Sequence, residues 1–490
     1  MVKPSLWEGD WENAIRDMKL KTFVILLLAG FAAQGQVPPP PQAPSNGPAP
    51  ILRQQFQIDY GGSVAQGQAT ADTLSLTLLD ALKRGLQYNL GVLVNRDVVA
   101  AAKAERRRSL SALLPNLTVG AMQTSQQLDL VAFGLNVPGF PTIVGPFGYQ
   151  NIRAYGQETI YDRPSLKNLK SAAETQKAAE LTADEARNLV VQAVSNAYLS
   201  VIIDAARVDA IQAEINTAQA LFDRAADQKK AGVVPGIDVL RAEVQLRTEQ
   251  QRMVAQTNQV EKDKLVLARA IGLPSGQAFS LFDRLPFAPL QTSRDELLKQ
   301  AYDNRPDFRA AQVTMRAAQF AIDAARAEHY WPSVVVQADY GDIGNTLAES
   351  HGTYSVVAGV RVPIYTGGRS AADVAQAESV LRNSKNAMED LRGRIDFEVR
   401  NALLDLQSAE TQVNVARTNA DLANQTLTQA RDRFAAGVTD TIEVVQAQQL
   451  LASANENYIG ALGAHNAAKI ALATAVGAGE ERVPQYLGLK

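Results

Sequence analysis

The sequence contains no cysteine and has three histidines among its 490 residues. The absence of cysteine excludes disulfides, thiolate metal sites, cysteine nucleophiles and a lipid-modified N-terminal cysteine. His329, His351 and His465 stand far apart, so no histidine-based metal centre is expected. An excess of one charge is also missing, because 48 Lys and Arg face 51 Asp and Glu. We therefore expect no metal, no cofactor and no nucleic acid as partner.

Aromatic residues are scarce, at 6% of the chain against 46% apolar residues in total. The apolar content is mostly Ala, Val and Leu, a mixture typical of long helices. Proline is absent from 366–477. The catalytic patterns GxSxG, HExxH, GxGxxG and the P-loop are absent too, so the sequence predicts no catalytic residue and no enzyme.

The N-terminus is typical of an exported protein. Residues 18–36 combine Lys19 and Lys21 with an apolar run and small residues, which predicts a signal peptide cleaved near Ala32–Gln36. A membrane anchor is the alternative, but the run is short for a span of about 30 Å. Residues 1–17 are interpreted as an upstream extension, and the proline-rich 37–74 as a flexible segment. No other long apolar run follows, so re-entry into a membrane would require β-strands.

The remaining sequence contains an internal duplication. Residues 194–272 align without a gap on 399–477, with 20 identities in 79 positions. A duplication of this length predicts a quasi-symmetric architecture. We divide the chain into a first repeat (75–274), a linker (275–294), a second repeat (295–478) and a C-terminal tail (479–490).

Both repeats have the same order of elements. A helical segment (76–113 and 295–330) ends at Pro115 and Pro332. A β-hairpin (116–162 and 333–365), a very long helix (165–230 and 369–435), a glycine-containing tip turn (231–236 and 436–440) and a last helix (237–271 and 441–476) follow. The expected fold is mainly α, with two β-hairpins that give four strands per chain.

The long helices carry a coiled-coil repeat, in which apolar residues alternate at spacings of three and four. In the second copy these are Val399, Ala402, Leu406, Ala409, Val413, Ala416, Ala420, Ala423, Leu427, Ala430 and Phe434; the first copy runs from Val194 to Ala225 and includes Ala205. A single pair of such helices would leave much of this seam exposed, so more helices are expected to pack around it.

The strand segments alternate differently. In 354–364 every second residue is apolar or tyrosine, as expected of strands that face lipid on one side and a lumen on the other. The pattern around 149–161 is ambiguous. Four strands cannot close a membrane barrel, which needs about eight. Either the strands are soluble hairpins, or several chains contribute to one barrel.

Two tip segments carry a resemblance to a known family. They begin Ala231-Gly232-Val233 and Ala436-Gly437-Val438, and continue as Ile237-Asp238-Val239-Leu240-Arg241-Ala242 and Ile442-Glu443-Val444-Val445-Gln446-Ala447. Together with Pro115, Pro332, Gly272 and Gly477, they resemble the TolC family of outer-membrane efflux and secretion ducts over about 75–480. The resemblance implies a homotrimer with a 12-stranded barrel in outer-membrane lipid and a periplasmic tunnel of helices.

The same resemblance implies partners and site residues. The partners would be a periplasmic adaptor protein and an inner-membrane transporter of the RND, ABC or MFS type, with the six tip residues 231–233 and 436–438 in contact with the adaptor. Asp238 and Glu443 would take part in a pore constriction. Gln446 replaces a second carboxylate, Thr439 stands where a basic partner would be, and Phe434 can pack but cannot donate a hydrogen bond. The sequence leaves two alternatives for the function, an adaptor-like protein and a coiled-coil scaffold without channel activity.

Overall fold

The computed structural model describes residues 60–134, 141–232, 234–290, 292–439, 441–480 and 482–488. The predicted extension and signal peptide lie outside these residues. The contacts divide the described chain into two units. The strand unit comprises Leu110–Leu166 and Ala327–Thr366, and the helical unit comprises Ile58–Ser109, Lys167–Arg326 and Gly367–Lys490.

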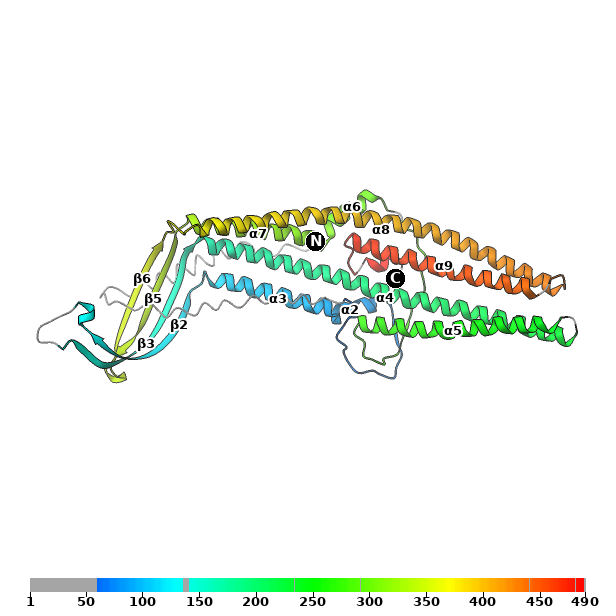
Figure 1. Ribbon diagram of the computed structural model, residues 1–490, viewed down its shortest axis with the longest axis horizontal. Helices are drawn as coiled ribbons and strands as arrows, with labels where there is room; N and C mark the ends of the chain where they lie inside the picture. The colour runs from blue at the N-terminus through cyan, green and yellow to red at the C-terminus, as the bar shows by residue number, and fades with distance from the viewer. Residues whose placement is uncertain are drawn as a thin grey trace. The chain divides into compact units, whose positions relative to one another are not determined.

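The strand unit is a four-stranded antiparallel sheet to which each repeat gives two strands (Figure 1). Its strands are β2 (Asn116–Asp129), β3 (Ile143–Asp162), β5 (Ser333–Gly344) and β6 (His351–Arg361), in the order β2-β3-β5-β6. Both predicted hairpins are confirmed, and the ambiguous segment around 149–161 belongs to β3, the longest strand. The second hairpin ends at Arg361, four residues before the predicted end. Strands β2 and β6 are the two edges of the sheet.

One face of this sheet is polar and the other is apolar. The register places Thr118, Tyr155, Asp339 and Ser355 in one row, and Leu117, Gly156, Ala338 and Val356 in the next row on the opposite face. Large side chains of the apolar face are exposed within the chain: Leu117 by 76%, Val119 by 74%, Tyr340 by 65% and Val360 by 68%. Among the described residues, these side chains of the apolar face are left without cover.

The polar face carries a buried ion network that ties three strands together. Arg153 of β3 pairs with Asp339 of β5 and donates to the hydroxyl of Thr353 on β6. Its Nε also donates to Asn151 Oδ1 at 3.3 Å. Since Arg153 is 7% exposed, removing any of these acceptors would leave a buried cation with fewer partners. The network therefore holds the register of the β3-β5-β6 part of the sheet.

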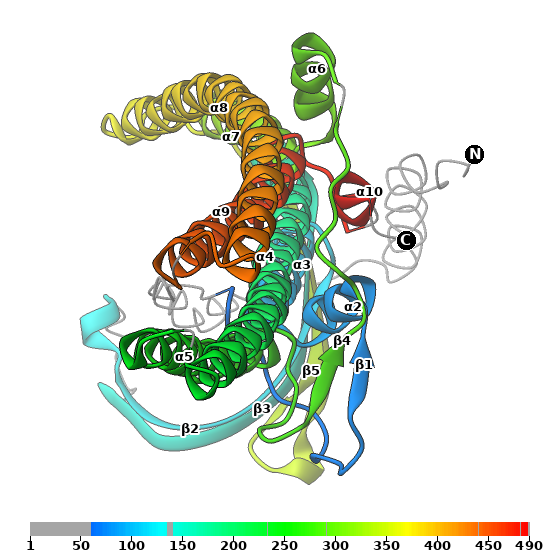
Figure 2. The same ribbon diagram turned by 90° about the vertical axis from the view of Figure 1, so that its right-hand side faces the viewer.

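The helical unit is built on two helix pairs that each end in a tip turn. The first pair is α4 (Arg163–Lys230) and α5 (Gly236–Ala270), and the second is α8 (Arg369–Ala435) and α9 (Thr441–Ala475). Figure 2 faces the tip turns and shows both pairs end-on. The predicted seam of the second copy is buried along its whole length except at Ala420, which is half-buried; in the first copy Ala205 is exposed. The coiled-coil prediction is thus confirmed, with a less regular first copy.

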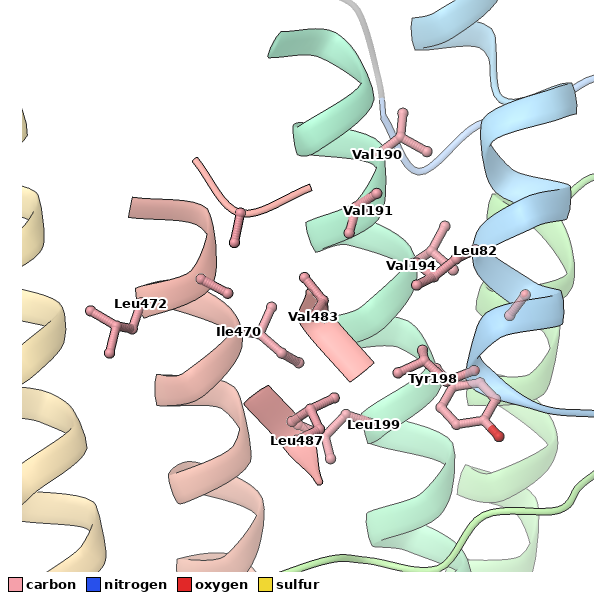
Figure 3. Close-up of a cluster of buried hydrophobic side chains, with 14 of the residues drawn as sticks. Leu82, Val190, Val191, Val194, Tyr198, Leu199, Ile470, Leu472, Val483 and Leu487 are labelled. Carbon is pink, nitrogen blue, oxygen red and sulfur yellow. The ribbon is translucent and has the colours of Figure 1, made fainter. Parts of the chain in front are cut away.

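One helix of the described chain, α4, is long and apolar enough by composition to cross a membrane. Half of its most apolar stretch is buried inside the chain. Figure 3 shows why: Val190, Val191 and Val194 of α4 point into the main core. The apolar stretch of α4 thus contributes to the interior of the helical unit.

This core joins segments that are far apart in the sequence. Around α4 lie α2 (Leu78–Tyr88), the end of α9 and the short α10 (Val483–Leu487), and their side chains meet as Figure 3 shows. Tyr198 is 1% exposed, and its hydroxyl lies 2.7 Å from Asp283 Oδ2. Burial, followed by the hydrogen bond to Asp283, raises the pKa of Tyr198, so the hydroxyl stays protonated as a donor.

The first helical segment of each repeat is broken, where the sequence analysis expected one continuous element. Helix α2 gives way to α3 (Leu90–Ser111) at Asn89, and α6 (Arg294–Asn304) gives way to α7 (Pro306–Tyr330) at Arg305. The side chain of Asn89 donates to the carbonyl of Ala270 at 3.3 Å, and Arg305 donates to the carbonyl of Ala475 at 3.2 Å. Ala270 and Ala475 are the last residues of α5 and α9, so each break binds the end of the closing helix of its own repeat.

The linker between the repeats also contains regular structure. Its strand β4 (Phe279–Leu281) pairs in parallel with β1 (Leu74–Leu76), which precedes α2. Leu78 N at the start of α2 donates to Asp283 Oδ2 at 3.1 Å, just after β4. The linker is therefore anchored to the start of the first repeat.

Candidate functional site

The two tip turns have the same backbone conformation at their glycines. Gly437 has φ of 71°, its N–H bonds to the carbonyl of Phe434 at 3.1 Å, and the N–H of Val438 bonds to that of Arg433 at 3.0 Å. This pair of bonds is a Schellman motif, which satisfies the last carbonyls of α8. Gly232 has φ of 72° and bonds to Lys229 at 3.0 Å in the equivalent way. Both glycines thus occupy a left-handed position in the glycine-containing turns that the sequence predicted. Val233 lies outside the described residues, as does residue 440.

Replacing Gly437 by valine should lower the stability of this tip. No side-chain or backbone atom lies within 4 Å of the added Cβ, so the cost arises from the positive φ and amounts to about 1–2 kcal/mol. The apparent melting temperature in detergent would measure it. Gly393→Ala on α8 is the control, because that glycine is helical and equally uncrowded, and the change should stabilise by about 0.5–1 kcal/mol. Equal melting temperatures for the two variants would contradict the assignment.

Asp238 lies in the first turn of α5 and is 5% exposed. Its backbone N–H bonds to the carbonyl of Pro235 at 3.1 Å, and its Oδ1 lies 3.3 Å from Nη1 of Arg241. A carboxylate in this position is stabilised by the N-terminal end of the helix. Arg241, which the sequence analysis did not single out, is its cation within the chain. The role of Asp238 in a constriction stays a prediction.

Glu443 lies in the first turn of α9 and contacts the other helix of its pair. Its Oε1 is 3.3 Å from Nε of Arg433, and its other oxygen accepts a hydrogen bond from Thr439. Thr439 cannot form an ion pair because its side chain is uncharged, but its hydroxyl donates a hydrogen bond to the Glu443 carboxylate. Arg433 is the cation that the sequence analysis missed; it stands at the end of α8, ten positions away, and comes close because the chain reverses between them.

The remaining constriction candidates differ in burial. Phe434 is 4% exposed and packs in a small core at the tips with Leu221, Ala225, Ala242, Leu427, Ala430, Val444 and Ala447. Arg224 of α4 lies over its ring at 5.9 Å from the centroid. Gln446 is exposed on α9. Phe434 thus packs as expected, while Gln446 is accessible at the surface.

A groove runs between α5 and α9 beside the tips and has a volume of about 490 Å³. It is lined by Ile237, Leu240, Arg241, Val244 and Gln245 of α5 and by Ile442, Val445, Gln446 and Gln449 of α9. Its apolar side chains are accessible: Ile237 is 50% exposed, Leu240 58% and Val244 67%. We call this surface the tip groove. Four α5 residues of this lining correspond to four of its α9 residues at the 205-position offset between the repeats. Both copies therefore present the same face of the last helix.

The sequence analysis did not identify the tip groove, although a signal was present. Ile237, Leu240, Arg241 and Val244 recur at helical spacing and lie on one face. This stripe could equally have been core, and only the packing shows that it is exposed. Among the described residues, no group of three or more His, Asp or Glu side chains is placed to hold a metal.

The family model for outer membrane efflux proteins matches residues 83–273 and 297–478, which is most of the chain and covers both repeats. The chain belongs to the outer membrane efflux protein family. It is therefore an outer-membrane protein related to the channels of efflux pumps, with a periplasmic helical portion. The adaptor-like and scaffold alternatives do not explain a match to this family over both repeats.

Curated relatives of this efflux family cover similar lengths. The chain is 27% identical to outer membrane protein OprJ of Pseudomonas aeruginosa over 420 residues, or 80% of this chain and 83% of that protein. It is 25% identical over 418 residues to the toluene efflux pump outer membrane protein TtgF of Pseudomonas putida, covering 79% and 82%. The match to pyoverdine export outer membrane protein OpmQ of Pseudomonas aeruginosa is 23% over 421 residues, covering 81% and 86%.

Solved structures share the fold. VceC of Vibrio cholerae aligns with a TM-score of 0.69 at 17% identity, covering 82% of this chain and 96% of that one. The open state of the MtrE channel of Neisseria gonorrhoeae aligns with a TM-score of 0.68 at 17% identity, covering 85% and 96%. At these identities the likeness concerns the fold.

Proposed function

We propose that this family member is a homotrimeric, passive exit duct of a tripartite efflux pump, opened by a periplasmic adaptor together with an inner-membrane transporter. The observation that carries the proposal is the four-stranded sheet with two unpaired edges and an uncovered apolar face. The names of the relatives, which include toluene efflux and pyoverdine export, support service in an efflux pump rather than in type I secretion.

The number of chains follows from the number of strands. An open sheet edge cannot remain in hydrocarbon, because its N–H and C=O groups would have no partner. Two chains would supply eight strands, and a barrel of about eight is filled by its own side chains. Three chains supply twelve strands from four each and leave room for a passage. The polar face with Arg153 would then line the passage, and the apolar face would contact lipid.

The trimer is tested by joining neighbouring chains through the edges of their sheets. Thr118 on β2 and Ser355 on β6 lie on the same face at opposite edges. With cysteine at Thr118, a scan of cysteines along β6 should give dimer and trimer bands under oxidising conditions, and the natural chain adds no thiol of its own. Cysteine at Thr118 alone is the control. A monodisperse monomer in native mass spectrometry that still conducts ions in a bilayer would contradict the proposal.

The adaptor is proposed to bind the tip turns and the tip groove. The groove exposes five aliphatic side chains beside an arginine and three glutamines, which suits an amphipathic helical hairpin from a partner. One tip offers less than the roughly 800 Å² per partner of a standard interface. Three chains present two tips each, so an oligomeric adaptor can bind with an avidity about 10² to 10⁴ above that of a single contact.

Glu443 is the proposed carboxylate of the constriction, where three chains would bring three copies together. Rings of carboxylates favour cations. Glu443→Gln should therefore lower cation selectivity in planar bilayers and raise the resting conductance modestly, because it also weakens the contact with Arg433. Glu261→Gln, at an exposed carboxylate paired with the half-buried Lys264 of α5, is the matched control. Unchanged selectivity in Glu443→Gln would assign this carboxylate to the helix start alone.

A further inference from the structure

A second polar cluster lies at the junction of the two helix pairs and shares Gln245 with the tip groove. Four helices border a cavity of about 70 Å³ there. Its polar lining consists of Glu214 and Thr217 from α4, Gln245 and Glu249 from α5, and Gln448 and Asn455 from α9; Leu427 of α8 is among the apolar lining. Polar residues thus gather where the first pair packs against the second.

The charges in this cluster do not balance. Arg252 Nη1 lies 3.0 Å from Glu214 Oε2 and 2.8 Å from Glu249 Oε2, and its Nη2 lies 3.7 Å from Glu456 Oε2 of α9. The side chains of Glu214 and Glu249 are 12% and 5% exposed. Three carboxylates therefore face one guanidinium, and two of them are held close together by the same nitrogen. A further cation, Arg207, lines the neighbouring cavity with Glu214, Arg252 and Glu456.

Helix α9 contributes an unsatisfied group to the same cavity. Gln448 is 7% exposed, and neither its amide nitrogen nor its amide oxygen has a hydrogen-bond partner. A buried amide without partners destabilises the fold, unless a group or a water within reach can satisfy it. The cavity is wide enough for water, and its remaining polar side chains carry carboxyl, amide and hydroxyl groups. Gln448 lines the same cavity as the Glu214–Glu249 pair, so one water there could join its amide to the pair.

We propose that Glu214 and Glu249 bind one proton between them, and that this proton locks the first helix pair against α9 until a rise in pH releases it. With the proton bound, the two carboxyls and Arg252 form a neutral unit that can remain buried. Without the proton, two adjacent carboxylates compete for one guanidinium in a confined space. Separation of α9 from α4 and α5 would admit water and relieve this repulsion.

The raised pKa of Glu214 supports the proposed binding of a proton at this pair. Burial, as the largest cause, raises its pKa from 4.5 to about 7, and the Glu249 charge adds to the rise while Arg252 opposes it. A carboxyl whose pKa is raised in the folded state contributes stability that is fully present below pH 4.5 and is lost as pH rises toward 7. The lock is therefore closed at acid pH and weakened above about pH 7.

Hydrogen exchange tests the lock without reference to transport. In the intact protein in detergent, the amides of 445–455 and 210–218 should lose protection between pH 5.5 and 8.5, after correction for the intrinsic exchange rate. The loss should be about ten-fold for each pKa unit by which opening lowers the pKa of Glu214. Glu214→Gln should make protection independent of pH in this range, and Glu249→Gln should do the same if Glu214→Gln folds poorly.

Glu185 provides the matched control. Its pKa is also raised to about 7, by burial first and then by Asp307, but it does not line the cavity at the junction of the helix pairs. Glu185→Gln should therefore leave the pH dependence of 445–455 as in the natural protein. Protection that does not depend on pH in the natural protein, or a dependence that survives in both Glu214→Gln and Glu249→Gln, would overturn the proposal.

The consequence for conduction rests on the proposed function and is measured separately. Single-channel conductance should rise with pH in the natural protein and stay at its acid value in Glu214→Gln. If the protein shows the pH-dependent exchange but never conducts ions, the proposed duct function is wrong and the proton lock stands. If it conducts ions but its exchange does not depend on pH, the proton lock is wrong and the duct function stands.

Discussion

Changing Val233 and Val438 together to glutamate is expected to abolish efflux in cells while trimer yield and single-channel conductance stay as in the natural protein. Val438 is 68% exposed immediately after Gly437, so the change alters the tip surface and keeps the glycine that the turn requires. A charge at each tip opposes the burial of apolar surface against an adaptor. Because the six contacts of the proposed trimer would act together, the loss of avidity of about 10² to 10⁴ should remove transport completely.

The matched control is Val254→Glu, the same substitution at an exposed valine of α5 outside the tip groove. It should retain transport, which a drug-susceptibility assay in an efflux-deficient strain would show. Leu240→Glu, within the tip groove, should behave like the tip variant. Full efflux with glutamate at both tips would mean that the tips are structural turns and that the partner binds elsewhere.

Arg305→Met is expected to destabilise the helical unit by about 3–5 kcal/mol, the usual effect of removing one partner from a buried ion pair. Arg305 is 7% exposed and lies 2.7 Å from Asp307 Oδ2 and 2.5 Å from Glu398 Oε2. It also binds the last carbonyl of α9, at Ala475. Its loss would leave two carboxylates and a carbonyl with fewer partners. The apparent free energy of unfolding in urea, followed by circular dichroism in detergent, measures the effect.

A surface ion pair of the same unit provides the comparison. Arg187 and Glu480 lie 3.0 Å apart with side chains 41% and 39% exposed. Arg187→Met should therefore change stability by less than about 1 kcal/mol. If both variants lost the same small amount, Arg305 would be a peripheral group and the break between α6 and α7 would be held by other contacts.

Much of the fold could be predicted because its signals are local and repeated. The spacing of Val399, Ala402 and Leu406 gives the seam of a helix whatever lies across from it, and the structure buries all three. The glycines of the tips follow the same reasoning, since a residue that ends a helix in the left-handed region is usually glycine. The alternation along β6 predicted two faces of different polarity, and the register confirms them.

The elements that were missed depend on distant partners. The break at Asn89 is stabilised by its side chain, which donates to the carbonyl of Tyr60 at 2.7 Å. The residues next to Asn89 in the sequence give no signal from which this contact could be predicted. The break at Arg305 had a local signal, because a residue before proline tends to leave the helix, and Pro306 follows it. The pairing of β1 with β4 joins segments about 200 positions apart, which no pattern within either segment could indicate.

The site shows the same division. The positions of Asp238 and Glu443 at helix starts could be predicted, but their cations could not. Arg241 lies on the next turn of its own helix, while Arg433 approaches Glu443 from the other helix of the pair. The tip groove arises because α5 and α9 lie side by side, and that adjacency comes from the packing of the two repeats. The constriction itself stays a prediction.

The unpaired edges of β2 and β6 also bear on how the protein reaches its place. Between export and insertion, a single chain must pass through water with two open strand edges and an uncovered apolar face. Such surfaces pair readily with any other extended chain and so favour aggregation. If the chain assembles as the proposed trimer, its biogenesis should therefore depend on periplasmic chaperones more than that of a barrel closed by one chain. The yield of that trimer should fall steeply when synthesis outpaces the encounter of three chains.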